Sequence, residues 1–152
     1  SSNAPAALGG DTATLDTKVS EELLSTEKER FVAVAINTIW RKPSSIVLEM
    51  EVSRWHPDTT ISLFLFPYGS GKPFSHMPKL HLNLKAESHE VLDQNRRLPK
   101  TSVEIIRSGK KLAIHAPMEL LEGGTKLLCS ARTQFGLVPL DWTPWRVMEL
   151  SE

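Results

Sequence analysis

The stretch IVLEMEV at residues 46–52 decides the fold class. Every second side chain from Ile46 to Val52 is apolar, and Glu49 and Glu51 lie between them. Successive side chains of a β-strand point to opposite faces, so this two-residue period gives the strand one apolar face and one largely polar face. Such a strand packs its apolar face on a core and turns the other to water. The sequence therefore predicts a layered β protein.

Strand signals recur on both sides of this stretch. Alternating, β-branched or aromatic residues predict further strands at 31–40, 61–66, 80–84, 103–106, 112–116, 127–131 and 145–150. The strand at 61–66 is apolar on both faces, which predicts a central position covered from both sides. Residues 87–100 are polar and are predicted to form a connection.

Turn residues separate the predicted strands, for example Pro43-Ser44-Ser45 and Ser108-Gly109-Lys110. The sequence shows no alternation of strands with helices, which argues against a doubly wound parallel sheet. We predict an all-β fold, an antiparallel β-sandwich of about eight strands. A jelly-roll and an immunoglobulin-like arrangement both fit.

The ends of the chain bear on its domain organisation. Ser2-Asn3-Ala4 resembles the scar of a removed expression tag, and residues 5–14 have the Ala, Gly and Thr content of a linker. We therefore expect residues 1–14 to be tag remnant and flexible linker, residues 15–152 to be a single β-sandwich domain, and the natural protein to carry a signal peptide or another domain upstream. Residues 15–30 fit a short helix or an irregular lead-in.

Composition excludes several classes of protein. Of the 152 residues, 40% are hydrophobic and 24% charged, as in ordinary globular proteins. Eighteen basic and eighteen acidic residues balance, so no overall field attracts nucleic acid. The apolar runs are far shorter than the ~20 residues of a membrane span. The compartment stays open, although the linker and the single cysteine favour a periplasmic or extracellular location.

The sequence contains no complete catalytic motif. Cys129 lies in an apolar strand and is predicted to be an inert core thiol. The histidines lack the short spacing of metal ligands, and Glu49 and Glu51 are predicted to face solvent. His56-Pro57-Asp58 is typical of a turn. We predict a protein that is not an enzyme and has no metal and no cofactor, since an enzyme would need a concave site with converging carboxylates or histidines.

Aromatic residues beside loop signals are the candidate ligand contacts. Trp55, Tyr68 and Trp142 lie there, and indole or phenol rings can stack on sugar faces. Trp40 and Trp145 are predicted to pack in the core. Polar groups would complete such a site by hydrogen bonding, and the candidates are Asn83, Arg132, Gln134 and Asp141.

Two segments carry a family resemblance. Residues 103–121 read VEIIRSGKKLAIHAPMELL, a strand, a Gly turn, a second strand, a proline and a Leu-Leu turn, and residues 139–150 read PLDWTPWRVMEL. This pattern resembles that of carbohydrate-binding, family-9-like β-sandwich domains, which often accompany polysaccharide-processing enzymes. The resemblance implies a non-catalytic accessory module whose partners are a polysaccharide or oligosaccharide and an upstream catalytic domain. The alternative is a protein-interaction or structural domain with no small-molecule ligand.

Overall fold

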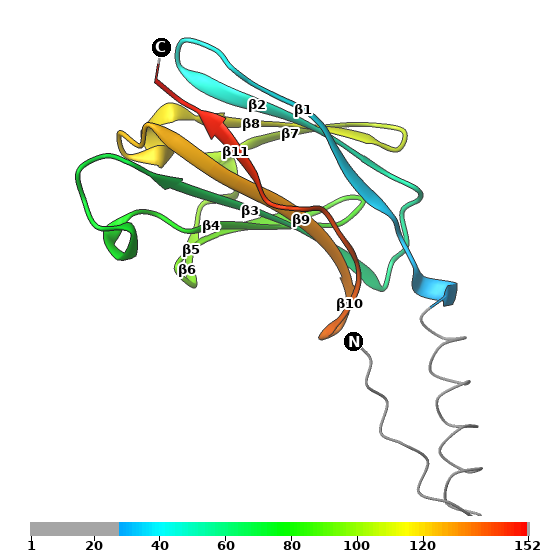
Figure 1. The fold of residues 1–152 in the computed structure, drawn as a ribbon. Helices are drawn as coiled ribbons and strands as arrows, with labels where there is room; N and C mark the ends of the chain where they lie inside the picture. Colours follow the sequence, from blue (N-terminus) through cyan, green and yellow to red (C-terminus); the bar gives the residue numbers. More distant parts are fainter. Residues whose placement is uncertain (1–27, 152) are drawn as a thin grey trace, which may run out of the picture.

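The computed structural model describes residues 28–151, which form two antiparallel β-sheets packed face to face (Figure 1). The smaller sheet has the order β1-β2-β8-β7. Its strands are β1 (Val34–Arg41), β2 (Ser45–Val52), β7 (Glu104–Ser108) and β8 (Lys111–Pro117). The all-β sandwich predicted from the sequence is therefore confirmed. The predicted linker and most of the lead-in segment lie outside the described residues.

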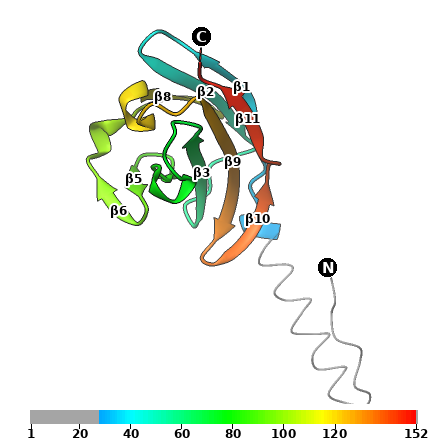
Figure 2. The ribbon, with the colours of Figure 1, turned by 60° about the vertical axis from the view of Figure 1, so that its left-hand side comes forward.

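The larger sheet has the order β10-β9-β3-β4-β5-β6, and β11 also pairs with β9. In Figure 2, β3 lies at its centre, with β9 and β10 on one side and β5 and β6 on the other. Its strands are β3 (Thr59–Tyr68), β4 (Leu80–Leu84), β5 (His89–Asp93), β6 (Arg96–Leu98), β9 (Lys126–Phe135), β10 (Val138–Trp142) and β11 (Arg146–Glu149). Three short 3₁₀ helices, η1 (Phe74–His76), η2 (Lys100–Ser102) and η3 (Met118–Leu121), lie in connections.

Two pairs of neighbouring strands link the sheets. The chain passes from the smaller to the larger sheet between β2 and β3, and again between β8 and β9. In the smaller sheet β2 pairs with β8, and in the larger sheet β3 pairs with β9. The two crossings therefore run side by side, and β3 and β9 become the centre of the larger sheet.

The described residues contain eleven strands, three more than predicted. The prediction of a connection at residues 87–100 is wrong, because β5 and β6 occupy most of it. Only Val91 of these strands is fully buried, so they lack the apolar alternation that marks a strand in a sequence. The third strand that was not predicted is β10. It is half-buried or exposed along its whole length, so it also lacks the apolar alternation of a core strand.

The core lies between the sheets. The alternation at 46–52 is confirmed, since Ile46, Leu48, Met50 and Val52 are all buried, and they face the buried side chains of β3, Ile61, Leu63 and Leu65. The predicted central position of β3 is confirmed, but the prediction that both faces of this strand are covered is wrong. The side chains of Phe64 and Phe66 point away from the core and are only half-buried.

Hydrogen bonds close the sandwich where β1 meets β10 and β11. Arg146 of β11 donates from Nη1 to the carbonyl oxygen of Ile36 in β1 at 2.8 Å. The amide of Val34 donates to Oδ2 of Asp141 in β10 at 2.9 Å. These contacts join the edges of the two sheets.

Candidate functional site

The outer face of the larger sheet, turned away from the core, combines polar and aromatic side chains. On β3 it carries Thr60 and Ser62, then Phe64, Phe66 and Tyr68, because alternate residues share a face. The neighbouring strands continue this division. Gln134 and Arg132 of β9 lie opposite the polar pair, and Asn83 of β4 lies beside Ser62. One end of the outer face is therefore polar and the other aromatic.

The aromatic end is a row of packed rings, here named the aromatic strip. Trp145 lies 5.3 Å from Phe66 between ring centroids, Phe66 lies 6.4 Å from Phe74, and Phe74 lies 6.5 Å from Tyr68. Phe64 joins the strip at 6.0 Å from Phe66. Edge-to-face and tilted packing of this kind holds the rings in fixed orientations. The strip is thus a preformed apolar surface.

A hollow of about 600 Å³ adjoins the strip, and we name it the aromatic hollow. Trp142 and Trp145 line it together with Phe64, Arg132 and Ser130. Trp142 is 65% exposed and Trp145 is 52% exposed, so both indoles are available for contact. The guanidinium of Arg132 lies 5.1 Å from the centroid of the Phe64 ring, a cation–π contact. The hollow therefore combines open ring faces with a positive charge.

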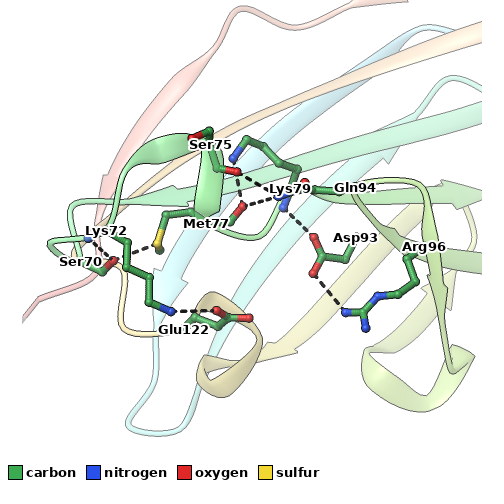
Figure 3. A network of polar contacts seen from close by, with 9 residues as sticks. All are labelled: Ser70, Lys72, Ser75, Met77, Lys79, Asp93, Gln94, Arg96 and Glu122. Carbon is green, nitrogen blue, oxygen red and sulfur yellow. Dashed lines mark hydrogen bonds and ion pairs between the residues drawn. The ribbon is translucent and has the colours of Figure 1, made fainter.

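The loop that presents Phe74 is held by a network of polar contacts (Figure 3). Lys79 Nζ donates to the carbonyl oxygens of Phe74 and Met77, and lies 3.9 Å from the centroid of the Phe74 ring. Gln94 Nε2 donates to the Met77 carbonyl at 2.9 Å, and Asp93 Oδ1 accepts from the amide of Lys79 at 3.0 Å. These contacts fix η1 against the β5–β6 turn, so Phe74 is held in place although 45% of it is exposed.

The polar end contains a chain of hydrogen bonds across four strands. Ser62 Oγ donates to Asn83 Oδ1 at 2.9 Å, and Asn83 Nδ2 donates to Glu90 Oε2 at 2.8 Å. Arg97 Nη2 completes the chain by donating to Glu90 Oε1 at 2.9 Å. A second hollow of about 430 Å³, the polar hollow, lies over this chain, and Asn83, Glu90, Arg97 and Gln134 are among its lining residues.

His81 lies where the aromatic and polar ends meet. Its ring stacks on Phe64 with centroids 4.5 Å apart. Burial lowers the pKa of His81, the nearby charge of Arg132 lowers it further, and Glu90 and Asn83 oppose the shift. His81 is therefore neutral at pH 7. Its Nε2 atom is buried and has no hydrogen-bond partner among the described residues.

The structure brings some of the predicted site residues together. Arg132 and Trp142 line the aromatic hollow, and Tyr68 ends the aromatic strip. Trp55 lies elsewhere: it packs against the core, and its Nε1 donates to the carbonyl oxygen of Gly109 at 2.8 Å. Asp141 fastens β10 to β1. Trp55 and Asp141 thus have structural contacts of their own.

The prediction that Trp40 and Trp145 pack in the core is wrong, since they are 37% and 52% exposed. Trp145 comes directly before β11 and turns outward onto Phe66. The sequence analysis also missed the outward role of Phe64, Phe66 and His81. Their alternation with Leu63, Leu65 and Leu82 was the available signal, but a strand that is apolar on both faces hides which face is open.

No group of three or more His, Cys, Asp or Glu side chains among residues 28–151 is placed to hold a metal ion. Cys129 is fully buried in β9, and burial raises the pKa of its thiol to about 11, so it is the predicted unreactive core thiol.

The sequence matches no known protein-family model, and no curated protein matches it at a significant level. No helix within residues 28–151 has the length and apolar character needed to cross a membrane. The outer face of the larger sheet is accordingly the basis on which a function is proposed.

Proposed function

We propose that this protein is a non-catalytic carbohydrate-binding module that binds a polysaccharide or oligosaccharide on the outer face of the larger sheet. The observation that carries this proposal is the juxtaposition of the aromatic hollow with the polar hydrogen-bond chain. Sugars present apolar C–H faces and hydroxyl edges, so they need stacking surfaces beside hydrogen-bonding groups. Trp142 and Trp145 supply the first, and Asn83, Gln134 and Arg132 supply the second.

The resemblance to family-9-like carbohydrate-binding domains agrees with this proposal in its implied ligand class. The proposed site includes Trp142, Arg132 and Tyr68 from the sequence analysis. It leaves out Trp55 and Asp141, because neither lines the aromatic hollow or the polar hollow. As an accessory module, the protein would hold a polysaccharide close to a catalytic domain.

Tryptophan fluorescence tests the proposal directly. Titration with soluble polysaccharides and their oligosaccharides is expected to give a saturable change, because both indoles of the aromatic hollow would be covered. Trp142→Ala and Trp145→Ala are each expected to weaken binding about tenfold, since stacking contributes on the order of 1 kcal/mol beyond the buried area. Trp40→Ala is the control, because Trp40 is an exposed indole on the smaller sheet, away from both hollows. No change across a broad panel would reject the proposal.

A second candidate function is the docking of a partner protein at the β9–β10 hairpin. Leu137 is 98% exposed at its tip, and the neighbouring Val138 is 38% exposed. Exposed aliphatic side chains favour protein contacts over sugars. Leu137→Ser would then abolish association without affecting polysaccharide binding, which sedimentation and fluorescence would separate.

A further inference from the structure

The charges on the outer face are unbalanced although the whole chain is neutral. Lys85, Arg97 and Lys100 line the polar hollow, and Arg132 lines the aromatic hollow. Glu90 is the single acidic side chain lining either hollow in the described part of the chain. Basic groups therefore outnumber acidic groups along the whole proposed binding surface.

The one carboxylate is already neutralised within the fold. Arg97 donates to one oxygen of Glu90, and Asn83 donates to the other. Within residues 28–151, no acidic side chain forms an ion pair with Lys85, Lys100 or Arg132. Three positive charges on the surface thus remain available to an anion.

These charges flank the sugar-binding groups rather than lying apart from them. Arg132 reaches over Phe64 in the aromatic hollow and lies opposite Ser62, which begins the polar chain. Lys85 and Lys100 line the polar hollow over that chain, and Lys85 Nζ donates to the carbonyl oxygen of Pro57 at 3.3 Å. A ligand lying across the outer face from Trp142 to Lys100 would meet ring faces first and positive charges along its length.

We infer that the ligand is an anionic polysaccharide, whose carboxylate or sulfate groups pair with Arg132, Lys85 and Lys100. This inference rests on the proposed function and names its ligand class. Guanidinium and ammonium groups form short, charge-assisted hydrogen bonds to both kinds of anion. The hydroxyl groups of such a ligand would donate to the oxygens of Asn83 and Gln134.

A single-stranded nucleic acid also carries negative charges and stacking rings. The outer face favours the sugar, because nucleic-acid binding depends on a basic groove along the whole backbone, and this chain carries no net charge.

The test compares charged and neutral polymers of matched backbone, using the full chain. Affinities are measured for polygalacturonate and its methyl-esterified form, for dextran sulfate and dextran, and for a single-stranded oligonucleotide. We expect binding to a charged polymer to be at least about tenfold tighter than to its neutral counterpart, and to weaken as salt is raised. The polymer pair that shows this difference identifies carboxylate or sulfate as the anionic group that the protein binds.

Three variants assign that binding to the outer face. Arg132→Gln, Lys85→Gln and Lys100→Gln are each expected to weaken binding of the charged polymer about three- to tenfold, the loss of one charge-assisted contact. Lys111→Gln, an exposed lysine on the smaller sheet, is the matched control and should leave binding unchanged. Equal urea midpoints for all four variants would show that folding is intact.

The outcomes separate this inference from the proposed function. Equal binding of charged and neutral polymers, lost in Trp142→Ala but unaffected in the three charge variants, overturns the inference and leaves the module a binder of neutral sugar. Tighter binding of the oligonucleotide, or equal weakening by Lys111→Gln, also overturns it. Absence of binding to every polymer rejects the proposed function as well.

Discussion

Removal of the acceptor for a buried hydroxyl is the most informative perturbation of the outer face. Ser62 has no exposed surface, and its hydroxyl donates to Asn83 Oδ1 at 2.9 Å. Asn83→Leu keeps a side chain of similar size over Ser62 but leaves the hydroxyl without an acceptor. A buried polar group without a partner costs about 1–3 kcal/mol, so the free energy of unfolding should fall by that amount.

The reverse change should cost less. In Ser62→Ala the orphaned group is Asn83 Oδ1, which is half-buried and can reach water, so we expect a loss of about 0.5–1 kcal/mol. In the double variant neither the Ser62 hydroxyl nor the Asn83 amide remains, so no buried hydroxyl lacks an acceptor. The double variant should therefore be more stable than the two single effects together predict, by about 1 kcal/mol.

Urea unfolding of the four proteins measures this coupling. The slope of the transition should stay constant, so that midpoints compare stabilities directly. The melting temperature should fall by roughly 4 °C for each kcal/mol lost. Single effects that add to within about 0.3 kcal/mol would refute the reasoning, because they would mean that the two side chains do not depend on each other.

Three further predictions concern groups outside this pair. Trp55→Phe should lower the free energy of unfolding by about 1 kcal/mol, because it removes the hydrogen bond from the indole to Gly109. It should leave the polysaccharide affinity measured by fluorescence titration unchanged. The fold lowers the pKa of His81 below its usual 6.5, so the unfolded chain binds the proton of this histidine more readily than the folded protein does. The free energy of unfolding should therefore fall as the pH drops below about 6.5. The urea midpoints of His81→Gln should lose this part of the pH dependence. Cys129, with its pKa raised to about 11, should resist a thiol reagent in the native protein at pH 8 and react fully in urea, and a native reaction would contradict its burial.

The sequence allowed the sandwich to be predicted because strands that border the core show a regular alternation of apolar and polar residues. The alternation at 46–52 identified β2 and its buried face, and the Ser108-Gly109-Lys110 turn identified the β7–β8 hairpin. In contrast, β5 and β6 were missed. Strands at the margin of a sheet bury few side chains, so their sequence is shaped by solvent and by charge pairs such as Arg97 with Glu90.

The candidate site was harder to predict for a related reason. Trp142 was predicted from an aromatic side chain beside a loop signal and Arg132 from its hydrogen-bonding groups, and both line the aromatic hollow. Phe64 and Phe66 were assigned to covered positions, because hydrophobicity alone cannot distinguish a second core face from an exposed aromatic surface. Which face remains open depends on how β9, β10 and β11 pack, and that arrangement follows from pairings between distant segments.

Those distant pairings also set the order in which the molecule can assemble. The central pair of the larger sheet joins Thr59 to Phe135, residues about 75 positions apart, and both of these strands contribute side chains to the outer face. Contacts of such long sequence separation are slow to form, and sandwiches of this kind fold in milliseconds to seconds. Hairpins such as β7–β8 can form early from local contacts alone. The outer face, in contrast, exists only once β3 has paired with β9, so a chain that lacks this pairing can have hairpins but no outer face.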